Sequence, residues 1–231
     1  MSEDDIIRIV KEKSSATQDR LDAILLMASQ YLPVYFDVLE DILNDHEDKP
    51  DIRSAVALAL GKIGRSKFSP PEKTLEVLKP HAFDEDVTVK NYVIQALGML
   101  GTSDAAPILI DALKDKSNIV FASAAEALGR LGEPVGPYLT DLVVTGADDA
   151  RCVAAWQLGE IRYRGAVNTL ANVVKEDENI EVKALAIWAL GQIGVGTPEV
   201  MSVLNWARVQ EDPDIRLRAE PAIKKIVRHS N

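Results

Sequence analysis

The sequence repeats one short pattern, Leu-Gly-x-(Leu/Ile)-Gly, at nearly regular intervals. Four clear copies occupy residues 60–64, 97–101, 128–132 and 190–194, and a degenerate copy occupies residues 158–162. The first glycines of successive copies are separated by 37, 31, 30 and 32 residues. A period of this length is typical of proteins built from stacked two-helix units, in which each unit packs only against its neighbours. The spacing therefore predicts an all-α repeat array.

One unit of the array is visible in residues 105–132. Pro107 stands near the start of a predicted first helix, where a missing N–H costs little, and Asn118 can cap the second helix. Gly129 lies inside that second helix, where glycine costs up to about 1 kcal/mol relative to alanine. We therefore expect a neighbouring helix to approach closely at this glycine. Gly132 is expected to end the helix in a left-handed conformation.

Alignment of the copies predicts the remaining helices. First helices are expected near residues 33–44, 72–80, 105–115, 135–144, 165–176 and 198–210. Second helices are expected near residues 51–63, 87–100, 119–131, 149–161, 180–193 and 214–228. An opening pair is expected at residues 3–12 and 18–31.

This pattern predicts a right-handed α-solenoid, an α–α superhelix of about six to seven helical pairs. We expect a single repeat domain over residues 1–231, with an atypical N-terminal cap at 1–32 and central repeats at 33–196. Residues 197–231 are expected to form a capping repeat, because terminal repeats must cover the core with a polar face.

The charge of the chain is acidic and unevenly distributed. The net charge is −10, yet residues 201–231 carry 6 basic and 4 acidic side chains. Residues 1–50 carry 12 acidic and 5 basic side chains. Nucleic-acid binding depends on Lys and Arg that neutralise phosphates, so this composition argues against a nucleic-acid partner.

The sequence contains no apolar run long enough to cross a membrane, and its acidic start lacks the features of a signal peptide. We therefore expect a cytoplasmic protein without a membrane partner, and the polar ends of the array favour a monomer. The single cysteine, Cys152, excludes an internal disulfide within one chain. We interpret Cys152 as a small buried or half-buried hydrophobe, with a bilin-carrying or redox role as the alternative.

Two segments depart from the repeat. The loop 65–71 is longer than its equivalents, and residues 162–165, Arg-Tyr-Arg-Gly, replace a glycine-terminated turn with a basic one. Variations of this kind often lie on one face of a repeat protein and can carry binding. Ordinary variation between loops is the simpler explanation.

The repeat unit resembles the HEAT repeat, in the short form known as the PBS-lyase HEAT-like repeat. The resemblance rests on a proline-led first helix ending in Asp, as in Pro107 to Asp115, and on second helices that end Ala-Leu-Gly-x-(Leu/Ile)-Gly. A basic residue near the start of the second helix also matches, at Arg53, Lys90, Arg151, Lys183 and Arg216. An Asp or Asn precedes each of these by two or four residues, and Phe121 interrupts the series.

This resemblance implies several functions. Some members of the family are phycobilin lyases or phycobilisome-degradation proteins, and others are scaffolds. A related helical-repeat enzyme, deoxyhypusine hydroxylase, binds iron through several His-Glu pairs. This chain has one such pair, His46-Glu47, with His81 and His229 far from it in sequence. We therefore expect no metal and no cofactor.

The second helices offer a candidate binding stripe, because positions i, i+4 and i+8 beside the core stripe vary in chemistry. These positions predict a concave surface whose candidate binding residues are Asn91, Gln95, Glu126, Arg130, Cys152, Trp156, Glu160, Trp188 and Gln192. Trp156 and Trp188 are equivalent and should be neighbours. They suit an interaction hot spot, or they fill the gap between second helices and widen the core. Trp206 is expected in the core.

No catalytic motif is present in the sequence: Gly-x-Ser-x-Gly, a glycine-rich phosphate loop and His-Glu-x-x-His are all absent. We therefore favour a non-catalytic module or adaptor that binds another protein or a peptide in its concave groove. The alternative is a phycobilin lyase-like or phycobilisome-associated factor, whose partner would be a bilin-carrying protein.

Overall fold

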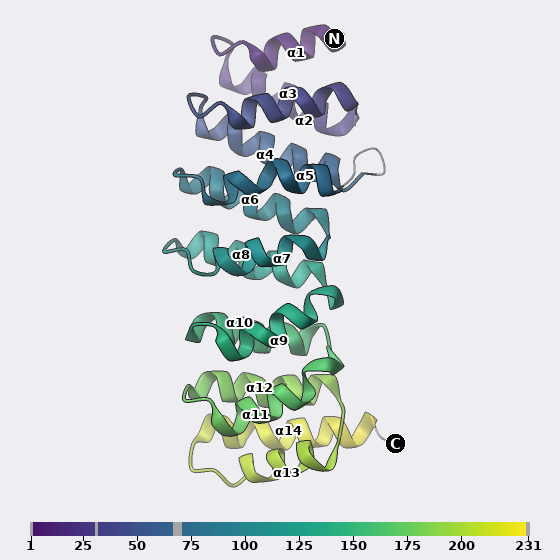
Figure 1. The fold of residues 1–231 in the computed structure, drawn as a ribbon, viewed down its shortest axis with the longest axis vertical. Coiled ribbons are helices and arrows are strands. Elements are labelled where there is room, and N and C mark those ends of the chain that lie inside the picture. Colours follow the sequence, from purple (N-terminus) through teal and green to yellow (C-terminus); the bar gives the residue numbers. More distant parts are fainter. Residues whose placement is uncertain (1, 31, 67–70, 230–231) are drawn as a thin grey trace. The chain divides into compact units, whose positions relative to one another are not determined.

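The computed structural model describes residues 2–30, 32–66 and 71–229. These residues form fourteen α-helices and four short 3-10 helices and contain no strand, which confirms the all-α solenoid class (Figure 1). Their contacts group into two compact units, unit 1 (Met1–Arg130) and unit 2 (Leu131–Asn231). The single-domain organisation expected from the sequence stays a prediction.

Unit 1 contains four helical pairs. Its helices are α1 (Glu3–Lys11), α2 (Thr17–Gln30), α3 (Pro33–Asn44), α4 (Pro50–Gly64), α5 (Pro71–Leu78), α6 (Val87–Leu100), α7 (Ala106–Ala112) and α8 (Asn118–Leu131), whose last residue begins unit 2. Short 3-10 helices, η1 (Lys79–Phe83) and η2 (Ser103–Ala105), precede α6 and α7.

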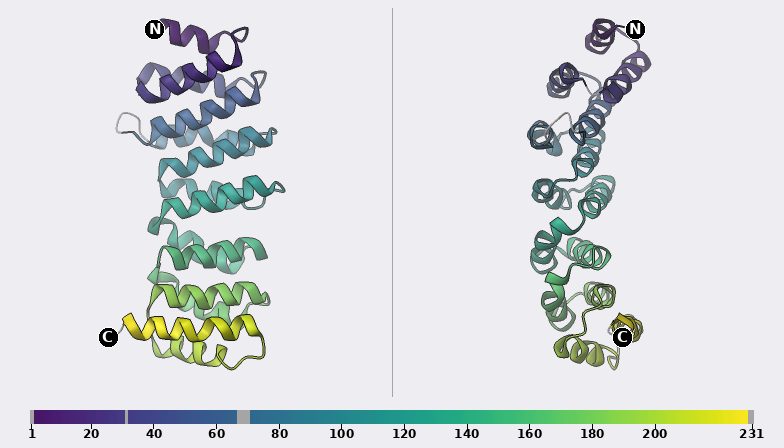
Figure 2. Two further views of the ribbon diagram at one scale, coloured as in Figure 1. Left: turned by 180° about the vertical axis from the view of Figure 1, so that it is seen from behind. Right: turned by 90° about the vertical axis from the view of Figure 1, so that its right-hand side faces the viewer.

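Unit 2 contains three helical pairs. Its helices are α9 (Gly136–Thr145), α10 (Asp148–Glu160), α11 (Val167–Glu176), α12 (Ile180–Ile193), α13 (Pro198–Ala207) and α14 (Pro213–His229), with η3 (Glu133–Val135) and η4 (Arg164–Ala166) before α9 and α11. The second helices α10, α12 and α14 lie side by side (Figure 2). All fourteen helices expected from the sequence are present, and α6 and α12 have the expected bounds.

The first glycine permits close helix packing in four of the copies, as expected, at Gly61, Gly98, Gly159 and Gly191. At Gly129 the close approach stays a prediction. A Cβ at Gly61 would lie 2.8 Å from the Cα of Ala96, and a Cβ at Gly191 would lie 2.8 Å from the Cα of Ala222. No real side chain tolerates such contact with backbone. The leucine that precedes each of these glycines is buried, at Leu60, Leu97, Leu128, Leu158 and Leu190.

The second glycine ends three of the helices. Gly101, Gly132 and Gly194 all have positive φ, between 70° and 75°. The expectation is wrong for Gly64, because α4 includes this residue and a Cβ there would lie 2.4 Å from Oγ1 of Thr74. In the degenerate copy Arg162 takes the left-handed conformation itself, with φ of 51°. The long loop expected at residues 65–71 lies partly outside the described residues.

Ion pairs connect successive repeats along the side where the two helices of each pair join. Arg20 Nη1 donates to Asp48 Oδ1 at 2.7 Å, and Lys90 Nζ donates to Asp115 Oδ2 at 2.6 Å. Arg53 makes the equivalent bonds to Asp84, and in unit 2 Arg151 Nε donates to Asp177 Oδ2 at 2.9 Å. Each carboxylate therefore belongs to the turn of the next repeat, 25 to 31 residues later.

These carboxylates also shape the turn that carries them. Asp84 Oδ1 accepts the amide of Asp86 at 2.9 Å, and Asp177 Oδ1 accepts the amide of Asn179 at 2.8 Å. One side chain thus caps the turn and holds the preceding second helix, which fixes successive repeats in register. We name this set of pairs the ladder; at Lys183 and Arg216 the basic side chain donates to backbone carbonyls instead.

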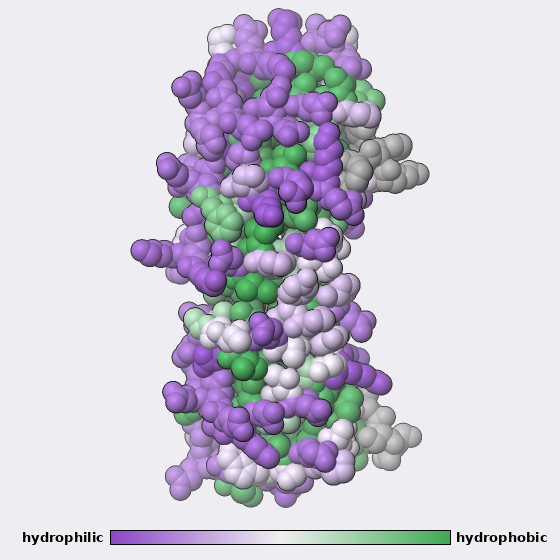
Figure 3. Space-filling model, viewed as in Figure 1, coloured by the Kyte–Doolittle hydropathy of each residue, from purple (hydrophilic) through white to green (hydrophobic). Residues whose placement is uncertain are grey.

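The surface of the N-terminal helices is hydrophilic. Figure 3 shows hydrophilic side chains over α1 and α3, in agreement with the acidic composition of residues 1–50. Within the described part of the chain, no helix has the length and apolar character needed to cross a bilayer.

Candidate functional site

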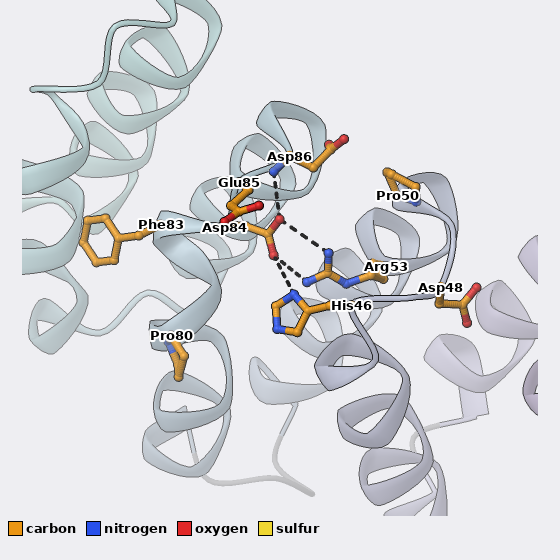
Figure 4. A pocket seen from close by; sticks show the side chains of 9 residues that line it. All are labelled: His46, Asp48, Pro50, Arg53, Pro80, Phe83, Asp84, Glu85 and Asp86. Atoms are coloured by element: carbon orange, nitrogen blue, oxygen red, sulfur yellow. Dashed lines mark hydrogen bonds and ion pairs between the residues drawn. The ribbon is translucent and has the colours of Figure 1, made fainter.

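A pocket of about 530 Å³ in unit 1 surrounds one step of the ladder (Figure 4). It is lined by His46, Asp48, Pro50, Arg53, Pro80, Phe83, Asp84, Glu85 and Asp86. Asp84 is its centre: it accepts hydrogen bonds from Arg53 and lies 3.9 Å from Nδ1 of both His46 and His81. Burial would raise the pKa of the Asp84 carboxyl, but the hydrogen bonds from Arg53 and from the Asp86 amide lower it below its usual value.

The histidine behind this carboxylate is structural. His81 is buried, and its Nε2 lies 3.0 Å from the Asn44 Oδ1 acceptor. Burial and the nearby Arg53 charge lower the pKa of His81, which favours the neutral ring. In the described ranges no group of three or more His, Cys, Asp or Glu side chains is arranged to hold a metal ion. The charges of this pocket stabilise the turn.

The candidate residues of unit 1 form two pairs with different contacts: Asn91 and Gln95 contact another helix, whereas Glu126 and Arg130 contact each other. Asn91 is buried, and its Oδ1 accepts from Ser123 Oγ at 2.7 Å, which joins α6 to α8. Gln95 Nε2 reaches the same hydroxyl at 3.5 Å. Asn91 is therefore not part of an exposed surface. Glu126 and Arg130 are exposed and bind each other at 2.7 Å along α8.

The two equivalent tryptophans of unit 2 have different environments. Trp156 on α10 is 44% exposed. Trp188 on α12 is half-buried, and its Cζ3 lies 2.5 Å from the place where a Cβ of Gly159 would stand. Trp188 therefore fills the gap between α10 and α12, which is the packing alternative, while Trp156 remains largely open to solvent. The glycine of the degenerate copy leaves room for an indole ring.

A second pocket, of about 310 Å³, lies between α12 and α14. It is lined by Trp188, Gly191, Gln192, Leu217, Arg218, Pro221, Ala222 and Lys225, mostly through apolar atoms. Leu217 beside it is 69% exposed. We define the second-helix face of unit 2 as the side of α10, α12 and α14 that carries Trp156, Trp188, Leu217 and Pro221. An apolar pocket beside an exposed leucine is a surface on which a partner could bury apolar area.

This face also has a gradient of charge. The last stripe position holds Glu160 on α10, Gln192 on α12 and Lys225 on α14, so the sign changes from negative to positive across three adjacent helices. Lys225 Nζ donates to Gln192 Oε1 across the α12–α14 contact. Leu217, Pro221 and Lys225 are not among the candidate residues expected from the sequence, although they occupy the corresponding positions of α14. Their equivalence to Trp188 and Gln192 was the available signal.

Two further sequence expectations have clear outcomes. Cys152 is half-buried, as expected, and burial followed by the charge of Glu181 raises the pKa of its thiol to about 11. The thiol is therefore protonated at neutral pH and a poor nucleophile. Trp206 is 39% exposed, so its assignment to the core is wrong. The apolar stripe of α13 runs through Val203, Leu204 and Ala207, and position 206 lies outside it.

This protein is an α-helical repeat protein. Its helix pairs are stacked, its successive second helices pack closely, and the ion pairs of the ladder connect successive repeats. The family model for HEAT repeats matches residues 73–151 and 144–224, which together cover more than half of the chain. The chain therefore belongs to the HEAT-repeat family, and part of it is similar in sequence to a phycobilin lyase subunit.

Individual relatives agree with this assignment. The chain is 37% identical over 87 residues to phycocyanobilin lyase subunit alpha of Nostoc sp. (strain PCC 7120), a match that covers 37% of this chain and 32% of that relative. An archaeal HEAT-like repeats protein from Thermococcus onnurineus NA1 has a TM-score of 0.60 at 18% identity, over 99% of this chain and 98% of its own.

The complex of CpcE and CpcF of phycocyanin lyase from Nostoc sp. PCC7120 has a TM-score of 0.50 at 19% identity, over 98% of this chain and 95% of the matched chain. At such identities the structural likeness shows the fold alone. The sequence match spans about a third of the lyase subunit's length, so it does not transfer that protein's activity.

Proposed function

We propose that this chain is a non-catalytic interaction module that binds a protein or peptide on the second-helix face of unit 2. The observation that carries the proposal is the open α12–α14 pocket between half-buried Trp188 and exposed Leu217. Interfaces gain most of their energy from a few large side chains that become desolvated in pockets. Trp156, exposed on the neighbouring α10, supplies a second such side chain.

The charged and polar clusters described elsewhere in the chain are already bound to other groups of the protein, which makes them less suitable as a binding surface than the second-helix face of unit 2. The ladder carboxylates are bound to Arg or Lys of the preceding repeat and to turn amides. Of the polar candidates of unit 1, Asn91 binds Ser123, and Glu126 binds Arg130. Repeat stacks present extended surfaces made of many helices, and binding to such surfaces is their usual activity.

The proposal is tested by the double variant Trp156→Ala with Leu217→Ala. Affinity capture from the source organism, quantified by mass spectrometry, should lose the enriched partner by tenfold or more. Trp206→Ala is the matched control, because this tryptophan is similarly exposed but lies on a first helix. Its capture profile should equal that of the original chain. Circular dichroism of all three proteins should coincide, since the changed side chains are largely exposed. Equal capture by the double variant would refute the proposal.

A phycobilin lyase-related role is the second candidate, favoured by the sequence match to the lyase subunit. It predicts that added phycocyanobilin shows a shifted absorption band and increased fluorescence with the protein. The half-buried Trp188 would report contact through quenching of its emission. An unchanged bilin spectrum at equimolar protein would eliminate this candidate and leave the protein-binding proposal intact.

A further inference from the structure

The α12–α14 pocket has walls suited to an aliphatic or aromatic side chain. Trp188 forms one wall, and Leu217 with Pro221 forms the other. Gly191 and Ala222 lie at the close approach of the two helices, where a Cβ at Gly191 would be 2.8 Å from the Cα of Ala222. The volume of about 310 Å³ is at the lower end of the range for small ligands, which suits one large side chain.

The charged side chains that line this pocket are all positive. Arg218 and Lys225 line it, and no Asp or Glu does among the residues described there. Arg218 is exposed and forms no ion pair with any described residue. The chain as a whole has a net charge of −10, whereas residues 201–231, which supply both cations, carry 6 basic and 4 acidic side chains. A carboxylate beside an apolar anchor would complement it.

The positions of the charges give a bound segment an orientation. Arg218 and Lys225 both belong to α14. On the other side of the face, Glu160 of α10 would repel a carboxylate. The acidic part of the segment is therefore expected over α14.

We propose that the α12–α14 pocket takes a large apolar side chain of an acidic peptide segment, with a carboxylate of the segment on Arg218. The inference rests on the proposed function, because the pocket belongs to the second-helix face of unit 2. It adds the chemistry and the orientation of the partner segment.

The test uses fluorescein-labelled twelve-residue peptides with one phenylalanine anchor, flanked by Glu, Gln or Lys. Fluorescence anisotropy with the full chain should give a Kd at least tenfold lower for the Glu peptide than for the other two. Replacement of the anchor by alanine should abolish binding. Raising the salt concentration should weaken binding of the Glu peptide most, because the contacts are exposed ion pairs.

Arg218→Glu should reverse the order, so that the Lys peptide binds more tightly than the Glu peptide. Lys175→Glu is the matched control: it makes the same change of charge at an exposed residue of α11, and it should keep the original order. Equal affinities for the three peptides, no binding by any of them, or an unchanged order in Arg218→Glu would each overturn the inference. If Trp156→Ala with Leu217→Ala still loses the natural partner in that case, the proposed function survives without it.

Discussion

Individual glycines show how the repeat pattern and the helix packing are connected. In an isolated helix, replacement of a glycine by alanine stabilises the helix by about 1 kcal/mol. At Gly191 the added methyl group would lie 2.8 Å from the Cα of Ala222, which is backbone and cannot move without shifting α14. The packing penalty, about 1–3 kcal/mol for overfilled sites, should therefore exceed the gain in helix propensity.

Gly191→Ala should accordingly lower the free energy of unfolding by about 1 kcal/mol or more, measured by urea denaturation. The sign of the change distinguishes the two effects, because helix propensity alone predicts an increase in the free energy of unfolding. Ser202→Ala, at an exposed position of α13, is the control and should be neutral or slightly stabilising. A more stable Gly191→Ala variant would contradict the close approach of α12 and α14.

Among the elements, the turns between paired helices depend on the ladder. Asp177 accepts two hydrogen bonds from Arg151 and one from the Asn179 amide, so one side chain holds α10 and starts α12. Asp177→Ala should cost about 2–4 kcal/mol, because it leaves a largely buried arginine without its partner. Urea denaturation measures this loss. Glu176→Ala, one residue earlier and exposed, should change stability by less than about 0.5 kcal/mol. Equal effects of the two substitutions would show that the ladder contributes little.

The helix bounds could be predicted from the sequence, whereas the ion pairs of the ladder could be predicted only in part. Helix bounds were accessible because the apolar stripe recurs in every copy, and capping residues and glycine stops recur in several of them. The basic residue of the ladder was visible for the same reason, as at Arg53 and Lys90. The acidic partner was not visible, because the acidic residue nearest in sequence lies at the start of the same helix, whereas Asp84 or Asp115 belongs to the next turn. A contact across one whole repeat leaves no local pattern.

Prediction of the candidate surface was limited by side-chain orientation. Periodicity places Asn91, Trp156 and Trp188 on one stripe, yet one is buried, one is exposed and one is half-buried. Small rotations of a helix about its axis decide among these outcomes, and they depend on the residues of the neighbouring helix. Trp206 shows the same limit, since one position along α13 separates it from buried Ala207.

The whole molecule should lose stability in acid, because its structural carboxylates are bound as anions. Hydrogen bonds from Arg20 and Arg53 outweigh burial and lower the pKa of Asp48 and Asp84, and a hydrogen bond from Lys90 lowers the pKa of Asp115. A carboxyl group whose pKa is lower in the folded chain binds protons more readily when unfolded. Its stabilisation is therefore present above the unfolded pKa of about 3.9 and is lost as the pH falls through the folded pKa.

The urea midpoint should consequently change little between about pH 7 and pH 5 and fall steeply below about pH 4. Asp84→Asn tests the origin of this dependence: its midpoint should be lower than that of the original chain at neutral pH, and it should fall less on acidification. Asp37→Asn is the control, because Asp37 is exposed and pairs only with exposed Lys73. Since an exposed pair contributes little, this variant should keep the original pH profile. A midpoint independent of pH down to about pH 3 would show that the buried pairs contribute no net stability, as replacement by apolar groups sometimes reveals in other proteins.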